Sequence, residues 1–145
     1  MEEGREGVLV FCSKDQAYQH DSFDRKYAIV RSIRKGFAPE FHQRIDLAPS
    51  SALFQKTYAK WKRAIFTPEE YLKMQHGKTH TWFDLYEEQF LKEMQSMPLD
   101  ELEQEVRNGN KVVCYCFCED PNRCHRKILY EYFVEKLGKE RVILQ

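Results

Sequence analysis

The sequence lacks three features that would each assign the protein to a particular class. It has no apolar run approaching the roughly 20 residues that a membrane span requires. Its first six residues are mainly acidic and polar and lack the apolar segment of a secretory signal. It also has no internal repeats and no low-complexity stretch. We therefore expect no membrane partner and a location in the reducing cytoplasm.

The chain also lacks a net charge, because its 145 residues include 23 basic and 23 acidic side chains. Non-specific nucleic-acid binding needs an excess of Lys and Arg that neutralises phosphates, so the composition disfavours it. Five cysteines are present, and in a reducing compartment we expect thiols or metal ligands rather than disulfides. The length suits one domain, and we predict a single domain over residues 1–145.

Apolar patterning predicts an α/β layered domain. Continuous apolar runs, typical of strands buried on both faces, occur at residues 8–12 and 27–30, and a third follows Lys111 and predicts a strand at 111–117. Helical spacing of apolar residues predicts helices at 50–65, from 67 onward, at 82–94, 98–109 and 124–137. A last strand is expected at 141–144. The strand–helix–strand order at the end predicts a small, mostly parallel sheet flanked by helices, in a Rossmann-like or rhodanese-like layout.

Two helix ends carry clear local signals. Thr67 is a good N-cap, Pro68 suits the first helical position, and Glu70 has the spacing of a capping-box partner. Gly138 follows the last apolar position of the final predicted helix and should end it.

Four of the five cysteines cluster where the late strand runs into the last helix. Cys114 and Cys116 share one face of the strand, and Cys118 and Arg123 lie in the turn. Cys124, His125 and Arg126 follow, where the helix begins. Ligands of open α/β sheets bind beyond the carboxyl ends of the strands, so we expect these groups to converge at a site. Cys114, like Cys12 on the first strand, has a buried core position as its simplest interpretation.

This cluster allows three chemical interpretations. In the first, Cys124 or Cys118 is a nucleophile, because a thiol near a helix N-terminus and beside Arg or His ionises more readily. The predicted catalytic residues are Cys116, Cys124, His125 and Arg126.

In the second interpretation the same groups bind a metal. Sulfur and imidazole donors favour zinc, and the predicted ligands are Cys116, Cys118, Cys124 and His125. In the third, backbone N–H groups at the helix start hold a phosphate or carboxylate, with Arg123, Arg126 and Arg31 as the anion-binding side chains.

The sequence resembles the family called domain of unknown function 488. The resemblance is carried by the strand into Cys116, the Asp120-Pro121 turn and Cys124-His125-Arg126, together with Leu47-Ala48-Pro49-Ser50 and a later tyrosine, Tyr58. It covers roughly residues 7–137. It implies a small α/β domain with suspected enzymatic activity and no settled reaction. An ungapped match places Cys118 where members of that family commonly have glutamate. Either the turn is one residue shorter in this chain, or a thiolate replaces the carboxylate, and the second alternative favours metal binding.

The leading hypothesis is a cytoplasmic enzyme that acts on a small anionic substrate, phosphorylated or nucleotide-like, at the end of strand 111–117. One alternative is a non-enzymatic binding module that a structural Cys/His zinc site stabilises. The other is a nucleic-acid accessory protein that uses the basic segment from Arg31 to Lys35.

Overall fold

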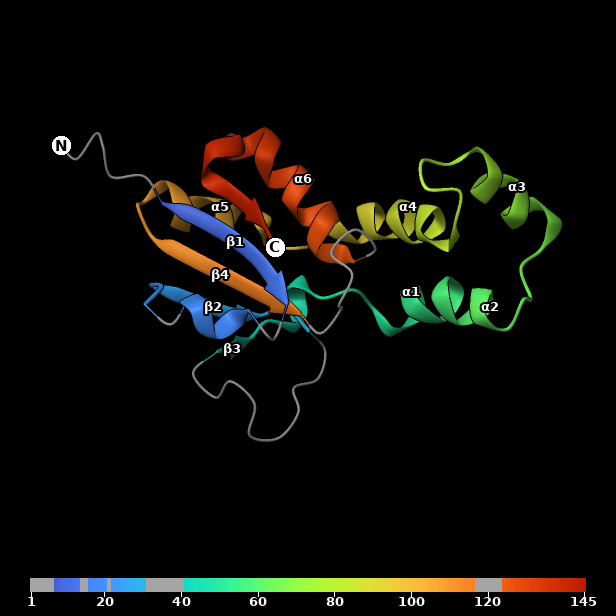
Figure 1. Ribbon diagram of the computed structural model, residues 1–145, viewed down its shortest axis with the longest axis horizontal. Helices are drawn as coiled ribbons and strands as arrows, with labels where there is room; N and C mark the ends of the chain where they lie inside the picture. The colour runs from blue at the N-terminus through green and yellow to red at the C-terminus, as the bar shows by residue number, and fades with distance from the viewer. Residues whose placement is uncertain (1–6, 14–15, 21, 31–40, 117–123) are drawn as a thin grey trace. The chain divides into compact units, whose positions relative to one another are not determined.

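A computed structural model describes residues 7–13, 16–20, 22–30, 41–116 and 124–145 (Figure 1). The chain forms two compact units. The sheet unit comprises Met1–Ala48 and Pro98–Gln145, and the helical unit comprises Pro49–Met97. The single domain over residues 1–145 stays a prediction.

The sheet unit is built on five strands in the order β3-β2-β4-β1-β5. Their bounds are β1 Val8–Ser13, β2 Arg25–Ala28, β3 His42–Gln43, β4 Lys111–Cys116 and β5 Val142–Leu144. Every pair of neighbouring strands is parallel. The predicted α/β fold with a parallel sheet and flanking helices is confirmed.

The two central strands, β1 and β4, are those with the most continuous apolar sequence. Leu9 to Cys12 and Val112 to Cys116 are all buried, as expected for parallel strands covered on both faces. The register pairs Phe11 with Cys114 and Ser13 with Cys116, so the two strands end together. The carboxyl end of β4 therefore lies beside the carboxyl end of β1.

Two helices cover the sheet, α5 (Leu99–Arg107) and α6 (His125–Leu137). They contact each other, and α6 also packs on β1 and β5. The core face of α6 includes Ile128, Leu129 and Phe133, which are buried at helical spacing. Gly138 follows with a φ of 96°, which L-residues rarely adopt, and so ends the helix as predicted. Short 3-10 helices occupy Ala17–His20, Ile45–Leu47 and Lys139–Arg141.

The helical unit contains α1 (Ser51–Lys56), α2 (Tyr58–Lys62), α3 (Pro68–His76) and α4 (Trp82–Met94). The Thr67–Glu70 capping box before α3 is present as predicted. The prediction of a single helix over 50–65 is wrong, because α1 ends before Thr57 and a separate helix, α2, begins after it. The Thr57 hydroxyl donates to the Leu53 carbonyl at 2.8 Å, and such local bonds compete with regular helix geometry.

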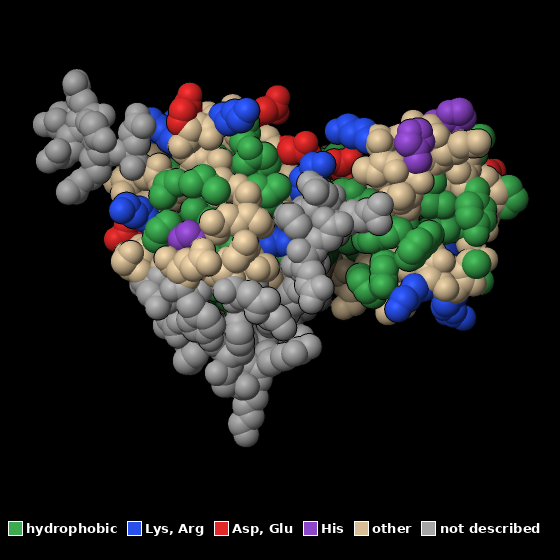
Figure 2. All heavy atoms as spheres, in the orientation of Figure 1, with side chains coloured by type: hydrophobic (Ala, Val, Ile, Leu, Met, Phe, Trp, Pro, Cys, Tyr) green, Lys and Arg blue, Asp and Glu red, His purple; other side chains and the backbone are tan. Residues whose placement is uncertain are grey.

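The surface of the helical unit carries many apolar side chains, drawn in green in Figure 2. Phe54, Trp61 and Leu72 are each about half exposed. Among the described helices of the chain, none is both long and apolar enough to cross a membrane.

Candidate active site

Three side chains meet where β4 ends and α6 begins. Cys116 is the last residue of β4, Cys124 is the N-cap residue of α6, and His125 is the first residue of that helix. The ligating atoms of these three residues lie within 4.8 Å of one another. In the part of the chain that the structure describes, this is the one group of three or more cysteine, histidine or carboxylate donors close enough to share an ion.

The distances define a chain of contacts centred on Cys124. Its Sγ lies 3.0 Å from the Sγ of Cys116 and 3.5 Å from Nδ1 of His125. A disulfide bond measures about 2.05 Å, so the two sulfur atoms belong to separate thiol groups in contact. Both sulfur contacts fall within hydrogen-bonding range, so Cys124 is able to exchange a proton with either neighbour.

The orientation of the His125 ring follows from its second nitrogen. Nε2 lies 2.9 Å from the backbone carbonyl of Ile29, which follows β2. A carbonyl oxygen only accepts, so we assign the hydrogen to Nε2, which donates it to Ile29. In the neutral ring Nδ1 is then an acceptor, and it faces the Cys124 thiol. The Ile29 N–H in turn donates to the Tyr115 carbonyl at 3.0 Å, which fixes this segment against β4.

The cluster is buried. Cys116 and Cys124 are each 1 % exposed and His125 is 3 % exposed. In such surroundings a charge is costly unless another charge or a hydrogen bond compensates for it. A proton moving from Cys124 to His125 would create two opposite charges in contact, which offset that cost for each other.

The other two described cysteines, Cys12 and Cys114, lie within β1 and β4. Burial raises the pKa of the Cys12 thiol to about 12, and the nearby positive charge of Arg126 offsets part of that rise. Burial also raises the pKa of Cys114. Both therefore stay protonated at neutral pH, and both fit the core interpretation that the sequence suggested.

The predicted anion-binding residues have different outcomes. Arg31 and Arg123 lie outside the described residues, as do Cys118 and Lys35. Arg126 is described and is fully buried, with Nη1 donating to the backbone carbonyl of Gln145 at 3.2 Å. Its role as an anion binder stays a prediction, and its charge acts inside the sheet unit, close to Cys12.

The metal interpretation can be tested against the sulfur distance. Three of the four predicted zinc ligands meet, and Cys118 lies outside the described residues. Zn–S bonds of about 2.3 Å at a tetrahedral angle place two sulfur atoms about 3.8 Å apart. The Cys116 and Cys124 sulfur atoms lie closer together, at 3.0 Å, so they would have to move apart to bind the same ion. The donor types fit zinc, whereas the spacing fits two thiols in contact.

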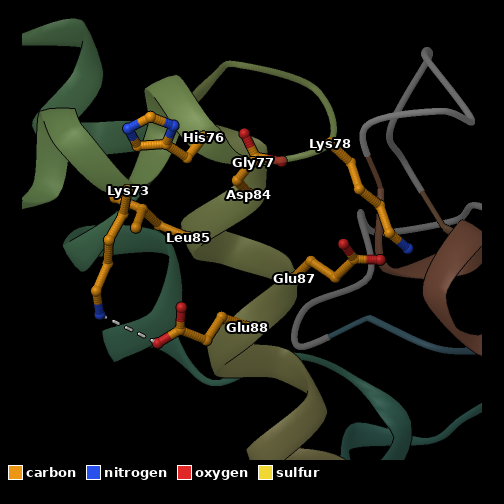
Figure 3. Close-up of a pocket in the computed structure, with 8 residues that line it drawn as sticks. All are labelled: Lys73, His76, Gly77, Lys78, Asp84, Leu85, Glu87 and Glu88. Atoms are coloured by element: carbon orange, nitrogen blue, oxygen red, sulfur yellow. Dashed lines mark hydrogen bonds and ion pairs between the residues drawn. The ribbon is translucent and has the colours of Figure 1, made fainter.

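A hollow of about 390 Å³ in the helical unit offers a second place to look for a site (Figure 3). Three of the charged side chains that line it have structural partners. Lys73 Nζ lies 3.4 Å from Glu88 Oε1. Asp84 accepts the backbone N–H groups of Thr79 and Thr81 at 2.9 and 3.1 Å, which caps α4. These contacts connect α3 to α4 and cap α4, and the hollow has no thiol or buried imidazole, so the Cys116–Cys124–His125 cluster is the stronger candidate.

Sequence reasoning missed one member of the site, the Ile29 carbonyl. It belongs to a backbone group 96 residues before His125 in the chain, and no residue type identifies such a group in advance. The apolar run at 27–30 located the segment but gave no indication that it would bind the imidazole.

The fold and the cluster together define a class of protein, a parallel α/β protein with two thiols and an imidazole at the carboxyl end of its central strand. A comparison with models of known protein families identifies the family. Residues 16–137 match the model described as the Active DUF488-N3 subclade, so the chain belongs to the DUF488 family, and the resemblance seen in the sequence is confirmed. The matched region contains the whole cluster. No curated protein and no solved structure matches the chain.

Proposed function

We propose that the protein is an enzyme that uses the Cys124 thiol as a nucleophile against a small anionic substrate. Phosphorylated or nucleotide-like compounds are the proposed substrate class. The catalytic residues are Cys124 and His125, and Cys116 positions the reacting sulfur. We also propose that it works in the reducing cytoplasm, where both thiols of the pair stay reduced.

One observation carries this proposal: the two ring nitrogens of His125 face two different partners. Nε2 donates to the Ile29 carbonyl, which leaves Nδ1 facing the Cys124 sulfur at 3.5 Å. This is the arrangement of an oriented base beside a nucleophile. Nδ1 takes the thiol proton, the thiolate attacks the electrophilic atom of the substrate, and the imidazolium returns the proton to the leaving group.

A hydrogen bond and a helix dipole stabilise the thiolate in this arrangement. The Cys116 S–H, with its sulfur 3.0 Å away, donates to the Cys124 sulfur once that sulfur is negative. Cys124 also occupies the N-cap position of a 13-residue helix, and its side chain makes no capping bond of its own. The positive end of the helix dipole therefore favours a negative sulfur there.

The charge pattern of the first turn of α6 supports an anionic substrate. Helices usually place Asp or Glu near the N-terminus, because acidic groups offset the positive end of the dipole. Here the first turn has no acidic residue and begins His125-Arg126-Lys127. With no acidic residue to offset it, the positive end of the dipole favours an anion beside it, such as the thiolate or a bound phosphate.

The low exposure of Cys124 sets a condition on access. Because the Cys124 side chain is 1 % exposed, its reaction with any external molecule requires a local opening of the surrounding chain. Its reactivity with small reagents therefore measures the opening and the nucleophilicity together.

Two alkylating reagents of similar size and different charge test the proposal. Iodoacetate is anionic and iodoacetamide is neutral, and both modify thiolates. We expect peptide mass spectrometry to show Cys124 modified first among the cysteines, with a larger preference for iodoacetate than free cysteine shows. Inorganic phosphate or a nucleoside monophosphate should slow the reaction.

Two variants and a metal analysis complete this experiment. His125→Gln should slow modification of Cys124 at least tenfold, whereas His42→Gln, at an exposed histidine of β3, should leave it unchanged. Modification of Cys124 no faster than that of Cys12 would overturn the nucleophile. An unchanged reagent preference without protection by phosphate would overturn the anionic substrate. A full equivalent of zinc in protein purified without chelator would overturn the proposal in favour of the metal interpretation.

A further inference from the structure

We infer that Cys116 is a resolving thiol: when a hydroperoxide oxidises Cys124, Cys116 closes a reversible disulfide with it. The inference gives the site a redox modification in addition to the proposed activity. It rests on the proposed function in one respect, because the first step needs Cys124 in its thiolate form.

The geometry of the pair is the main support. The two sulfur atoms are 3.0 Å apart, and a disulfide requires about 2.05 Å, so closure needs an approach of about 1 Å. Cys116 ends β4 and Cys124 precedes the first turn of α6, so neither residue lies in the interior of a regular element. Side-chain rotation at these two ends can supply that approach without breaking the sheet ladder or the helix.

The chemistry balances with one hydroperoxide. The Cys124 thiolate attacks the terminal oxygen of the hydroperoxide, the O–O bond breaks, and with one proton the products are an alcohol and a Cys124 sulfenic acid. The Cys116 thiol then attacks the sulfenic sulfur, the S–O bond breaks, and water leaves as the S–S bond forms. The two thiols lose two electrons and the hydroperoxide gains them. A dithiol reductant reverses the step by exchange.

The position of Cys116 also determines which reaction follows the oxidation of Cys124, disulfide closure or further oxidation. A sulfenic acid without a nearby thiol is open to further oxidation to a sulfinic acid, which most systems cannot reverse. With the Cys116 sulfur in contact with that of Cys124, disulfide closure is intramolecular and outpaces a second encounter with peroxide. Cys116 would therefore protect Cys124 from irreversible loss, and the disulfide would hold the enzyme inactive until it is reduced.

The matched control lies on the same strand. Cys114 is two residues before Cys116 on β4 and is as deeply buried. Cys116→Ala and Cys114→Ala each remove one buried thiol from this strand, and only the first removes the thiol in contact with Cys124.

The experiment treats the reduced full-length protein with hydrogen peroxide, stops the reaction in denaturant with a maleimide, and maps the peptides by mass spectrometry. We expect a Cys116–Cys124 linked peptide that dithiothreitol reverses, both in the parent protein and in Cys114→Ala. In Cys116→Ala we expect Cys124 to accumulate as sulfinic acid instead. Circular dichroism of each variant establishes that it is folded.

The outcomes separate this inference from the proposed function. Fast alkylation of Cys124 together with sulfinic acid in the parent protein overturns the resolving role and leaves the nucleophile standing. A link between Cys118 and Cys124 also overturns the role of Cys116. A Cys124 that neither iodoacetamide nor peroxide modifies overturns both proposals. A Cys116–Cys124 link that forms in spite of slow alkylation supports the pair and overturns the activated nucleophile.

Discussion

Replacement of His125 should separate the structural task of the imidazole from its chemical task. The ring connects the start of α6 to the Ile29 carbonyl through a 2.9 Å bond. Ile29 is fully buried, so water cannot readily replace a lost donor. A buried carbonyl left without its partner costs about 1–3 kcal/mol. Together with the lost packing of the ring, His125→Ala should lower the free energy of unfolding by about 2–4 kcal/mol.

His125→Gln should behave differently, because the glutamine amide nitrogen can occupy the place of Nε2 and donate to Ile29. The side chains are similar in volume, so the expected loss is below about 1.5 kcal/mol. The difference between the two variants therefore isolates the hydrogen bond, whereas both variants lack the imidazole that the proposed chemistry requires.

Urea denaturation followed by far-ultraviolet circular dichroism measures these losses. Both tryptophans of the chain, Trp61 and Trp82, lie in the helical unit, so their fluorescence reports on that unit separately. If residues 1–145 form a single domain, the two signals should change together in every variant. Equal destabilisation by alanine and glutamine, or no loss with alanine, would refute the importance of the bond to Ile29.

Three further predictions concern pH and helix capping. Burial and the hydrogen bond to Glu105 raise the pKa of Tyr27 to about 12, so the folded state keeps its phenol protonated at a pH where the unfolded chain ionises. Stability from this group is complete below about pH 10 and is lost as the pH rises towards 12; a Tyr27→Phe variant that shows the same alkaline loss would contradict this. Thr67→Ala removes the hydroxyl that accepts the Glu70 N–H and should destabilise α3 by about 1 kcal/mol, seen as faster amide exchange in that helix; unchanged exchange would count against the cap. Cys12 should resist alkylation near pH 8 in the folded protein, because burial raises its pKa to about 12, and ready labelling there would show that its surroundings open.

The sequence was informative where a local pattern decides the structure. Apart from Lys111 and Ser13 at their ends, β1 and β4 are apolar throughout, and this pattern predicts burial on both faces and a parallel sheet. The capping signals at Thr67 and the glycine at 138 act over a few residues and were read correctly. Cys116, Cys124 and His125 were predicted to converge because a strand end and the next helix start must be close.

The remaining features depend on contacts between distant segments or on a competing local bond. The Ile29 carbonyl orients His125 across 96 residues of sequence, and the Arg126 guanidinium reaches the Gln145 carbonyl inside the sheet unit. Neither partner carries a side-chain signal. At the break between α1 and α2, the Thr57 hydroxyl donates to the Leu53 carbonyl. The spacing of apolar residues does not indicate where such a break falls.

The proposed activity depends most on the His125 imidazole, which we infer makes Cys124 a reactive thiolate. The direct measurement is the rate of Cys124 alkylation by iodoacetamide from about pH 5 to about pH 10, in the parent protein and in His125→Gln, with denatured protein as the reference. We predict that the parent thiol stays reactive well below about pH 8.5, where an ordinary thiol loses its reactivity, and that the variant does not. Superimposable profiles for the two proteins would contradict the account.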